Sequence, residues 1–387
     1  MELIEVNDSK SARDFLRVNV ELNSIDPNYI RPLDKDINEV FDRRKNKAFR
    51  FGECARWILR NDEGKMIGRI AAFVNTKYKN KGDDVPVGGI GFFDCINNQD
   101  AADKLFDVAR HWLTARGMEA MDGPINFGER DRWWGLVVQG FDPPLYCMNY
   151  NPPFYQVLFE TYGFKNFFNQ VCFGLRVADR VAQKFYDRHQ ACAKDPNFSS
   201  KHIRKRELKQ FAKDFTIIYN KSFAGHGGMK ELAEPVVQKM FQSMKAVIDE
   251  KISWFAYYKG EPVAMWINLP DLNQWFKYLD GNFDALHKLQ FFWLKMTKKC
   301  SKFVGLAFGL VPEFQGKGVD SYLIMEGAEV IQSEALYDSY EMQWIGEFNP
   351  KMINIAENLP THRSRILTTY RYHFDQTKEF KRHPFLA

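Results

Sequence analysis

The chain has 387 residues, of which 45% are hydrophobic and 15% aromatic, and its 54 basic and 49 acidic side chains give a net charge of +5. This length suffices for two domains with a core each, and the apolar content excludes a disordered chain. The charge balance is too even to indicate nucleic-acid binding, so we expect no nucleic-acid partner.

Cysteine usage and hydropathy narrow the cellular setting. The six cysteines form no Cys-x-x-Cys pair and have no histidine at a metal-ligand spacing, so we expect reduced thiols and no bound metal. The N-terminus lacks a basic start followed by an apolar core, and no apolar run approaches the ~20 residues of a membrane span. These features predict a cytoplasmic protein without a transmembrane segment. Peripheral membrane contact stays open, as does the choice between a monomer and a homodimer.

The first half of the chain alternates helices and strands. The predicted elements are helix 9–22, strands 54–60, 66–74 and 87–95, helix 100–116, strand 118–125, helix 153–162 and strand 165–177. A turn at residues 61–65 joins the first two of these strands as a hairpin. A long loop rich in turn formers and aromatic residues fills the space between strand 118–125 and helix 153–162.

That loop contains Trp133 and Trp134. Long, shaped loops in compact domains are often functional. We therefore expect the loop to cover an acceptor cleft, with Trp133 and Trp134 contacting the substrate. The alternative is a compact loop that only packs on the sheet.

The second half repeats the order of the first. Its predicted elements are helices 204–223 and 229–249, strands 252–258, 262–269 and 303–311, helix 319–335, strand 340–348, a short helix from residue 350 and strand 364–374. Two matched series suggest an internal duplication. We predict one domain at residues 1–178, a connector at 179–200 and a second domain at 201–387.

The most specific motif begins at Val311, where a predicted strand gives way to a short loop and then a helix. Gly316 and Gly318 let the backbone turn tightly, so that consecutive N–H groups at the start of the helix converge on an anion. Lys317 adds a cation. Short glycine pairs also occur in ordinary turns, so the pattern alone leaves both interpretations open.

The order of strand, Gln/Arg-x-x-Gly-x-Gly/Ala and helix resembles the coenzyme A pyrophosphate loop of the GNAT (Gcn5-related) N-acyltransferase superfamily. Here the motif runs from Gln315 to Asp320, with an acid where the family prefers Gly or Ala. The first half resembles the same fold at residues 67–72 and 154–164. Its segment 93–100 has no glycine and two acids, so it lacks a phosphate loop.

As a whole the chain resembles tandem-GNAT proteins. The resemblance implies an α/β (α+β) fold with two tandem, mixed and mostly antiparallel sheets flanked by helices. It also implies an acyl-CoA-dependent N-acyltransferase, in which the amine of a small molecule or a peptide attacks the thioester directly.

The resemblance implies the following coenzyme A contacts: Leu310, Val311, Gln315, Gly316, Lys317, Gly318, Val319 and Asn349. In the family a backbone N–H before the loop binds the thioester carbonyl, and this donor would fall near Leu310 or Val311. Asn349 would contact the arm of the coenzyme.

Proton transfer requires a general base and an acid. Glu347, at the end of strand 340–348, is the expected general base, and a structural acid beside the next helix is the alternative. The following helix lacks the family tyrosine that protonates the leaving thiolate. Tyr370 and Tyr372 are the substitutes, and each is alternatively a packed strand residue. His226 is expected to meet the acceptor, or else to be an ordinary loop residue.

Acetyl-CoA is the expected donor, as a co-substrate. A first alternative is a long-chain acyl or aminoacyl transferase of the same fold, because the aromatic segment 270–300 could shape a larger donor pocket. A second is a non-catalytic CoA-binding or scaffold protein that kept the fold and lost the family tyrosine and the last glycine.

Overall fold

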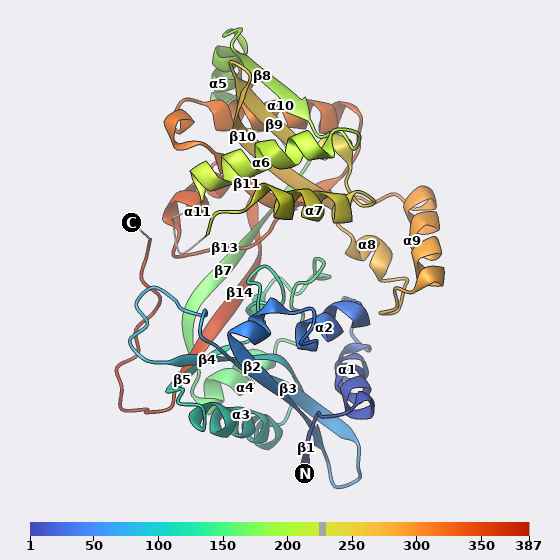
Figure 1. The fold of residues 1–387 in the computed structure, drawn as a ribbon, viewed down its shortest axis with the longest axis vertical. Coiled ribbons are helices and arrows are strands. Elements are labelled where there is room, and N and C mark those ends of the chain that lie inside the picture. The colour runs from blue at the N-terminus through green and yellow to red at the C-terminus, as the bar shows by residue number, and fades with distance from the viewer. Residues whose placement is uncertain (224–229, 387) are drawn as a thin grey trace.

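The computed structural model describes residues 1–223 and 230–386. One sheet runs through the whole molecule, in the order β1-β2-β3-β4-β5-β14-β7-β12-β11-β10-β9-β8, with β6 beside β14 and β13 beside β7. Figure 1 shows helices on both faces of this sheet in the first and in the second half.

The elements of the first half are β1 (Glu2–Glu5), α1 (Ser9–Asn23), α2 (Asp34–Phe41), β2 (Gly52–Arg60), β3 (Met66–Asn75), β4 (Val87–Cys95), α3 (Gln99–Thr114), β5 (Ala120–Gly123), β6 (Leu136–Gln139), α4 (Tyr155–Tyr162) and β7 (Lys165–Arg176). Those of the second half are α5 (Gln183–Ala193), β8 (Phe198–His202), α6 (Leu208–Ser222), α7 (Glu234–Met244), β9 (Trp254–Tyr258), β10 (Glu261–Pro270), α8 (Asn273–Phe276), α9 (Ala285–Thr297), β11 (Lys302–Leu310), α10 (Val319–Ser333), β12 (Ser339–Met342), β13 (Ile345–Gly346), α11 (Pro350–Glu357) and β14 (His362–His373). Short 3-10 helices lie at Lys47–Arg50, Glu250–Ile252 and Pro312–Phe314.

The predicted fold class, mixed α/β with mostly antiparallel strands flanked by helices, is confirmed. The strand predicted at 340–348 is interrupted, because β12 pairs with β11 whereas β13 pairs with β7. The segment 179–200, predicted as a connector, contains α5 and most of β8, and α5 packs on α10. The sequence analysis also missed α2 and α9.

The two halves of the sheet have matching strand patterns. In each half the strands next to the hairpin form a parallel pair. This pair is β4 with β5 beside the hairpin β2-β3, and β11 with β12 beside the hairpin β9-β10. In each parallel pair the strand nearer the hairpin carries a bulge. In β4, Phe92 has a φ of 50°. In β11, the register with β10 skips Leu306. A bulge turns the residues that follow it toward the opposite face.

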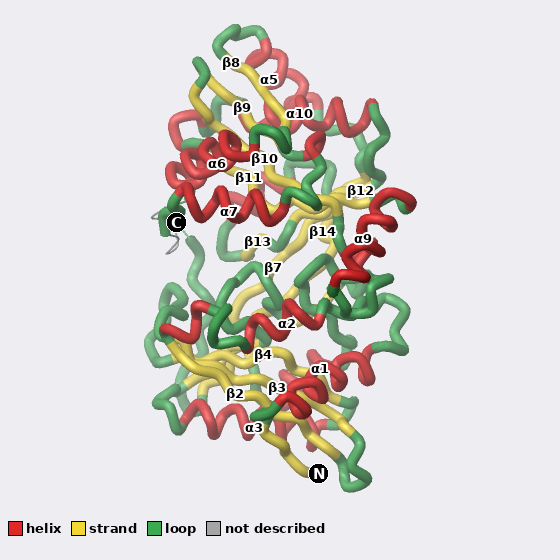
Figure 2. The backbone as a smooth tube through the Cα atoms, turned by 45° about the vertical axis from the view of Figure 1, so that its right-hand side comes forward, coloured by secondary structure: helices red, strands yellow, loops and turns green. Residues whose placement is uncertain are grey.

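The last strand of each half belongs to the sheet of the other half. Strand β14, at the end of the chain, pairs with β5, and β7 pairs with β12. The two exchanged strands also pair with each other, from His362 opposite Gly174 to Arg371 opposite Lys165. Figure 2 shows them side by side between the two halves. The domain limits at residues 178 and 201 stay a prediction, to which the structure adds this exchange.

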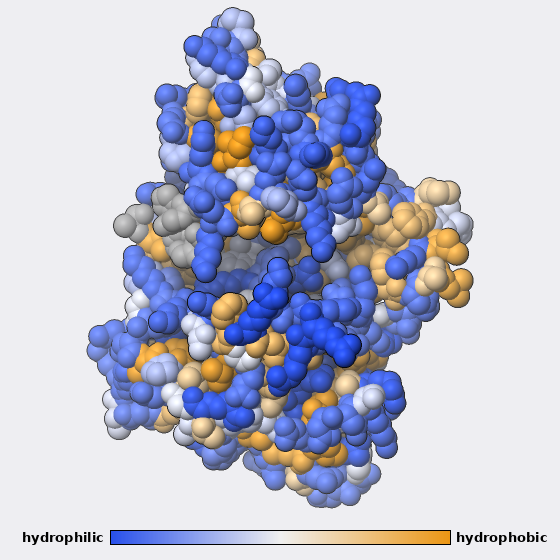
Figure 3. Space-filling model, viewed as in Figure 1, coloured by the Kyte–Doolittle hydropathy of each residue, from blue (hydrophilic) through white to orange (hydrophobic). Residues whose placement is uncertain are grey.

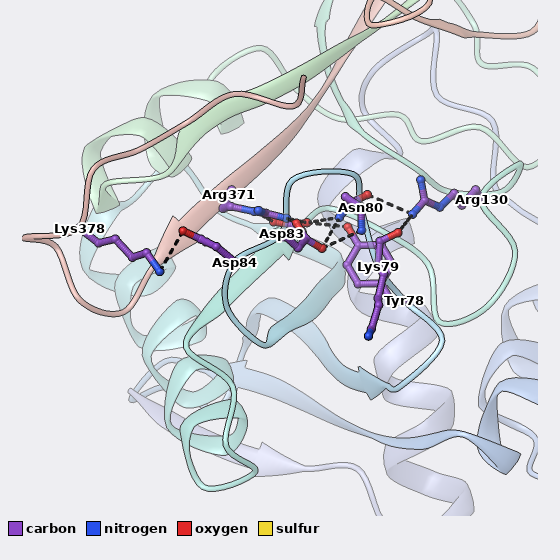
Figure 4. A network of polar contacts seen from close by, with 9 residues as sticks. Tyr78, Lys79, Asn80, Asp83, Asp84, Arg130, Arg371 and Lys378 are labelled. Atoms are coloured by element: carbon purple, nitrogen blue, oxygen red, sulfur yellow. Dashed lines mark hydrogen bonds and ion pairs between the residues drawn. The ribbon is translucent and has the colours of Figure 1, made fainter. Parts of the chain in front are cut away.

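A buried charge network fixes β14 in the first half. Arg371 donates to both carboxylate oxygens of Asp122 on β5, at 2.6 and 2.8 Å, and lies 2.8 Å from Asp83. Figure 4 shows Arg371 pointing from β14 to the loop that carries Asp83 and Asn80, and Lys378 reaching Asp84 beyond the strand. Buried charges need such partners, so the network specifies which strand completes the sheet.

Asp271, directly after β10, makes stability depend on pH. Its side chain is buried, and the burial raises its pKa from 3.8 to about 6. The folded state therefore holds this proton more tightly than the unfolded state. The resulting stability is present at low pH and is lost as the pH rises from about 4 to about 6.

We expect Asp271→Asn to raise the free energy of unfolding by about 1–3 kcal/mol at pH 7.5, and by less at pH 4.5. The amide removes the charge and keeps an oxygen that can accept the Asn273 N–H, which lies 3.2 Å from the carboxylate. Thermal unfolding at both pH values measures this, with the exposed Asp131→Asn as control. An equal gain at both pH values would contradict the assignment.

Candidate active site

The glycine loop between β11 and α10 has the backbone that the sequence predicted. Gly316 and Gly318 have φ values of 73° and 82°, in the left-handed region that favours glycine. Gly318 is the N-cap residue of α10, and among the described residues no side chain caps the helix there. The N–H groups of the first helical turn are thus available to an anion, at the positive end of the helix dipole.

Helix α5 adds a second cation to this loop. A Cβ built at Gly318 would lie 3.2 Å from the Cβ of Arg188, and the Cys192 thiol contacts the Lys317 carbonyl at 3.6 Å. Arg188 and Lys317 are both exposed. The sequence analysis missed Arg188, because only the packing of α5 on α10 brings it to the loop.

The corresponding helix start in the first half is organised differently. Helix α3 begins at Gln99, and the side chain of its N-cap residue Asn98 accepts the Ala101 N–H at 2.8 Å. This cap occupies one of the free donors that an anion would need. Among the described residues, the uncapped glycine loop therefore belongs to the second half.

An apolar cleft lies on the same face of the second half as α10, between α10 and α11. Its empty volume is about 830 Å³, part of it open to solvent. The apolar side chains that line it include Trp266, Phe303, Phe308, Ile324, Ala328, Ile331, Met342, Ile345, Met352, Ile355 and Leu359. Polar side chains are few, namely Asp179, Gln332 and Tyr340.

The cleft exists because two parallel strands separate. Strands β11 and β12 pair from Lys302 to Gly305, and Gln343 then donates its N–H to the Gly305 carbonyl at 2.9 Å. Beyond that point β11 bulges at Leu306 and β12 ends. A Cβ at Gly305 would lie 2.0 Å from the Tyr340 hydroxyl, so this position requires glycine.

Tyr340 is the hydrogen-bonding group at the inner end of the cleft, and the sequence analysis missed it. Its hydroxyl accepts from Trp266 Nε1 at 3.1 Å. Burial raises the pKa of the phenol to about 12, so the group is protonated at neutral pH. A protonated phenol beside the strand separation can donate a hydrogen bond to a polar group of a bound molecule.

The predicted carbonyl donor needs a correction. The bulge of β11 lies at Leu306, whereas the sequence analysis placed the carbonyl-binding N–H near Leu310 or Val311. The Val311 N–H already donates to Val263 at 2.9 Å, and Leu310 pairs with Ala264. Phe303 and Phe308 both line the cleft although they are five positions apart, an offset that places two side chains of a regular strand on opposite faces, so the bulge between them accounts for the change of face.

Two other predicted residues of the donor site are engaged within the fold. Glu347 accepts from the Asn169 backbone N–H at 2.8 Å and from its side-chain amide at 3.1 Å, and it pairs with Arg382. Asn349 caps α11 by accepting the Met352 N–H at 3.3 Å. In this conformation the Glu347 carboxylate is therefore already engaged by Asn169 and Arg382.

Tyr370 and Tyr372 lie in the core of the first half, where β14 pairs with β5. The Tyr370 hydroxyl donates to Glu160 at 2.8 Å. The cleft belongs to a different core cluster, formed mainly by elements of the second half. Their expected role as acids at the glycine loop therefore has no geometric support. His226 lies outside the described residues.

The loop that carries the predicted tryptophans lines a second cavity, in the first half. This cavity has an empty volume of about 770 Å³, part of it open to solvent, and Trp133 is part of its wall. Trp134 is buried beside Tyr78, with ring centroids 5.9 Å apart. Arg69 and Asp94 form a buried ion pair of 2.7 Å at the cavity. The loop packs on the sheet and also shapes this cavity, and the contact of Trp133 and Trp134 with a substrate stays a prediction.

Comparisons with known proteins give relatives over most of the chain. No protein-family model matches. The bacterial ceramide synthase of Caulobacter vibrioides is 25% identical over 372 residues, which are 93% of this chain and 94% of that protein. Protein YghO of Escherichia coli is 25% identical over 353 residues, 88% of either chain.

Two solved structures have similar folds. One is a tandem GNAT protein from the clavulanic acid biosynthesis pathway, with a TM-score of 0.54 and 12% identity over 97% of this chain and all of that one. The other is a GCN5-related glucosamine N-acetyltransferase region of a fungal multi-domain β-N-acetylglucosaminidase, with a TM-score of 0.53 and 11% identity. The match covers 96% of this chain and 38% of that longer protein. At these identities the likeness concerns the fold.

Proposed function

Since the chain has the tandem GNAT fold, we propose that it is an acyl-CoA-dependent N-acyltransferase that transfers a long acyl chain to an amine. The observation that carries this proposal is the apolar cleft between α10 and α11, on the face of the sheet that also bears the glycine loop. The proposal prefers the long-chain alternative to acetyl transfer.

The chemistry of the cleft favours a hydrocarbon. The pantetheine arm of coenzyme A carries amide groups, which must find hydrogen-bond partners when they are buried, whereas an acyl chain needs none. The lining offers many apolar surfaces and few polar groups. Each buried methylene contributes about 0.8 kcal/mol, so a long chain gains far more from such a cleft than an acetyl group does.

The name of one relative is consistent with this choice. This relative is called a ceramide synthase, and a ceramide is an amide between a fatty acid and the amine of a long-chain base. By analogy, we propose an amine as the acceptor of this chain, too.

The reaction we propose is direct. The first-turn N–H groups of α10, with Lys317 and Arg188, hold the pyrophosphate of the donor. The amine nitrogen forms a bond to the thioester carbonyl carbon, and the bond from carbon to sulfur breaks. The proton that the amine loses balances the one that the coenzyme A thiolate takes up. We assign Glu347 no part in this transfer, because Arg382 pairs with it.

A panel of donors tests the proposal. We expect palmitoyl-CoA to bind at least ~100-fold more tightly than acetyl-CoA, measured by calorimetry below the concentration at which palmitoyl-CoA forms micelles. Release of free coenzyme A in the presence of a long-chain amino alcohol measures turnover. Palmitoyl-carnitine, which has the chain without the nucleotide, is the control for binding by the chain alone.

The outcomes separate the alternatives. Equal or tighter binding of acetyl-CoA would contradict the long-chain proposal and favour an acetyltransferase. Binding without release of coenzyme A from any donor would favour a non-catalytic protein. Absence of binding by every CoA compound would contradict the donor site itself.

A further inference from the structure

Helix α9, in the insertion between β10 and β11, presents apolar side chains to solvent. Its inner side is used by the fold, since Phe291 and Leu294 are buried. On its outer side the following residues are 47% to 83% exposed: Leu286, Leu289, Phe292, Trp293 and Met296. Figure 1 shows α9 projecting from the edge of the molecule, and in Figure 3 this projection is coloured hydrophobic.

The fold holds this apolar stripe outward. Trp275 Nε1 donates to the Lys298 carbonyl, just after α9, at 3.1 Å, and Gln290 donates to the Tyr278 carbonyl at the same distance. The Phe291 ring packs against Trp275 and Phe276, with centroids 5.9 and 5.5 Å apart. Core packing therefore accounts for the inner side of α9 and leaves the outer side without a partner among the described residues.

The charges around the stripe indicate what would cover it. Residues 277–299 contain five lysines and two aspartates, a net charge of +3. Lys298 and Lys277 lie over the Tyr278 ring, 3.9 and 5.3 Å from its centroid. Lysines that flank exposed Leu, Phe and Trp side chains are the composition of a helix that lies in the interface of an anionic bilayer.

We propose that α9 docks this protein on the surface of a membrane that contains anionic lipid. The helix has 13 residues, and among the described residues no helix is both long enough and apolar enough to cross a bilayer. It therefore lies in the plane of the surface, with its apolar stripe among the acyl chains and its lysines at the headgroups.

The segment that leads into α9 lies beside the cavity of the first half. Asn273 of α8 lines that cavity and donates to the Pro144 carbonyl at 2.8 Å. Asp34 donates its N–H to Gly281, in the turn before α9, at 2.8 Å. Membrane docking would thus bring this cavity close to the lipid surface. The inference stands on α9 alone and does not depend on the proposed function.

Vesicle sedimentation tests the inference. We expect the protein to partition onto vesicles of phosphatidylglycerol and phosphatidylcholine, and less onto phosphatidylcholine alone. The double variant Leu289→Ser, Met296→Ser should lower this partitioning at least ~10-fold, because it removes apolar area from the stripe. Lys298→Glu with Lys299→Glu should weaken only the binding to anionic vesicles.

The matched control is Val157→Ser, on α4 of the first half, where Val157 is 61% exposed. It should bind vesicles as the parent does. Thermal unfolding and coenzyme A binding of each variant show that the fold and the donor site are intact, so failure here is distinct from failure of the proposed function.

Three results would overturn the inference. The parent protein could fail to bind anionic vesicles, or the double variant could bind them as well as the parent. A dimer that the double variant converts to a monomer, without vesicle binding, would show that a second copy of the chain covers the stripe.

Discussion

Gly318→Trp is expected to lower the affinity for coenzyme A about 1000-fold, equivalent to about 4 kcal/mol. Gly318 has a φ of 82°, which a residue with a Cβ adopts at a cost. The new side chain would start 3.2 Å from the Arg188 Cβ and would stand over the first turn of α10. It would therefore both block the N–H groups of the first turn and displace the Arg188 side chain. Calorimetry with coenzyme A measures the change.

A second glycine provides the control for Gly318→Trp. Gly260, in the turn between β9 and β10, has a φ of 84°, and no described atom lies within 4 Å of a Cβ built there. Gly260→Trp imposes the same backbone strain away from the loop and should leave coenzyme A binding unchanged. If Gly318→Trp bound coenzyme A like the parent, the glycine loop would not be the pyrophosphate site.

Ala328→Trp is expected to lower the affinity for palmitoyl-CoA about 1000-fold and to leave that for acetyl-CoA nearly unchanged. Ala328 is on α10, half-buried, and its side chain lines the apolar cleft. An indole there would displace about five methylenes of a bound chain. At about 0.8 kcal/mol for each methylene, the loss is about 4 kcal/mol. Calorimetry with both donors measures the ratio.

Ala115→Trp is the control for the cleft variant. Ala115 ends α3 in the first half and is exposed, so the same substitution there should change neither affinity. A loss of acetyl-CoA binding in Ala328→Trp would point to damage of the glycine loop. Unchanged palmitoyl-CoA binding would mean that the chain lies elsewhere.

The sequence predicts the glycine loop because all its determinants are local. A strand, two glycines and a helix follow one another between Lys302 and Ser333, and the backbone angles of Gly316 and Gly318 follow from that order. The long strands and helices were predictable for the same reason, since periodicity is a local signal.

Features that depend on distant contacts were not predictable in this way. Arg188 reaches the glycine loop only through the packing of α5, and Arg382 reaches Glu347 only because the C-terminal segment returns to β7. The partner of β14 is another such feature, because its pairing joins segments that are far apart in the sequence. The ion pair of Arg371 with Asp122 fixes β14 beside β5, and this pair cannot be recognised before the fold is known.

The place of β14 in the strand order also bears on how the molecule is completed during synthesis. Strand β14 follows all the other described strands in the sequence, yet it stands in the middle of the sheet, between β5 and β7. A nascent chain that lacks it has an open edge at β5, and β7 has a partner on one side only. Such edges are sites at which chains associate wrongly. Once β14 has been synthesised, it covers both edges at once, so the two halves of the sheet are completed together.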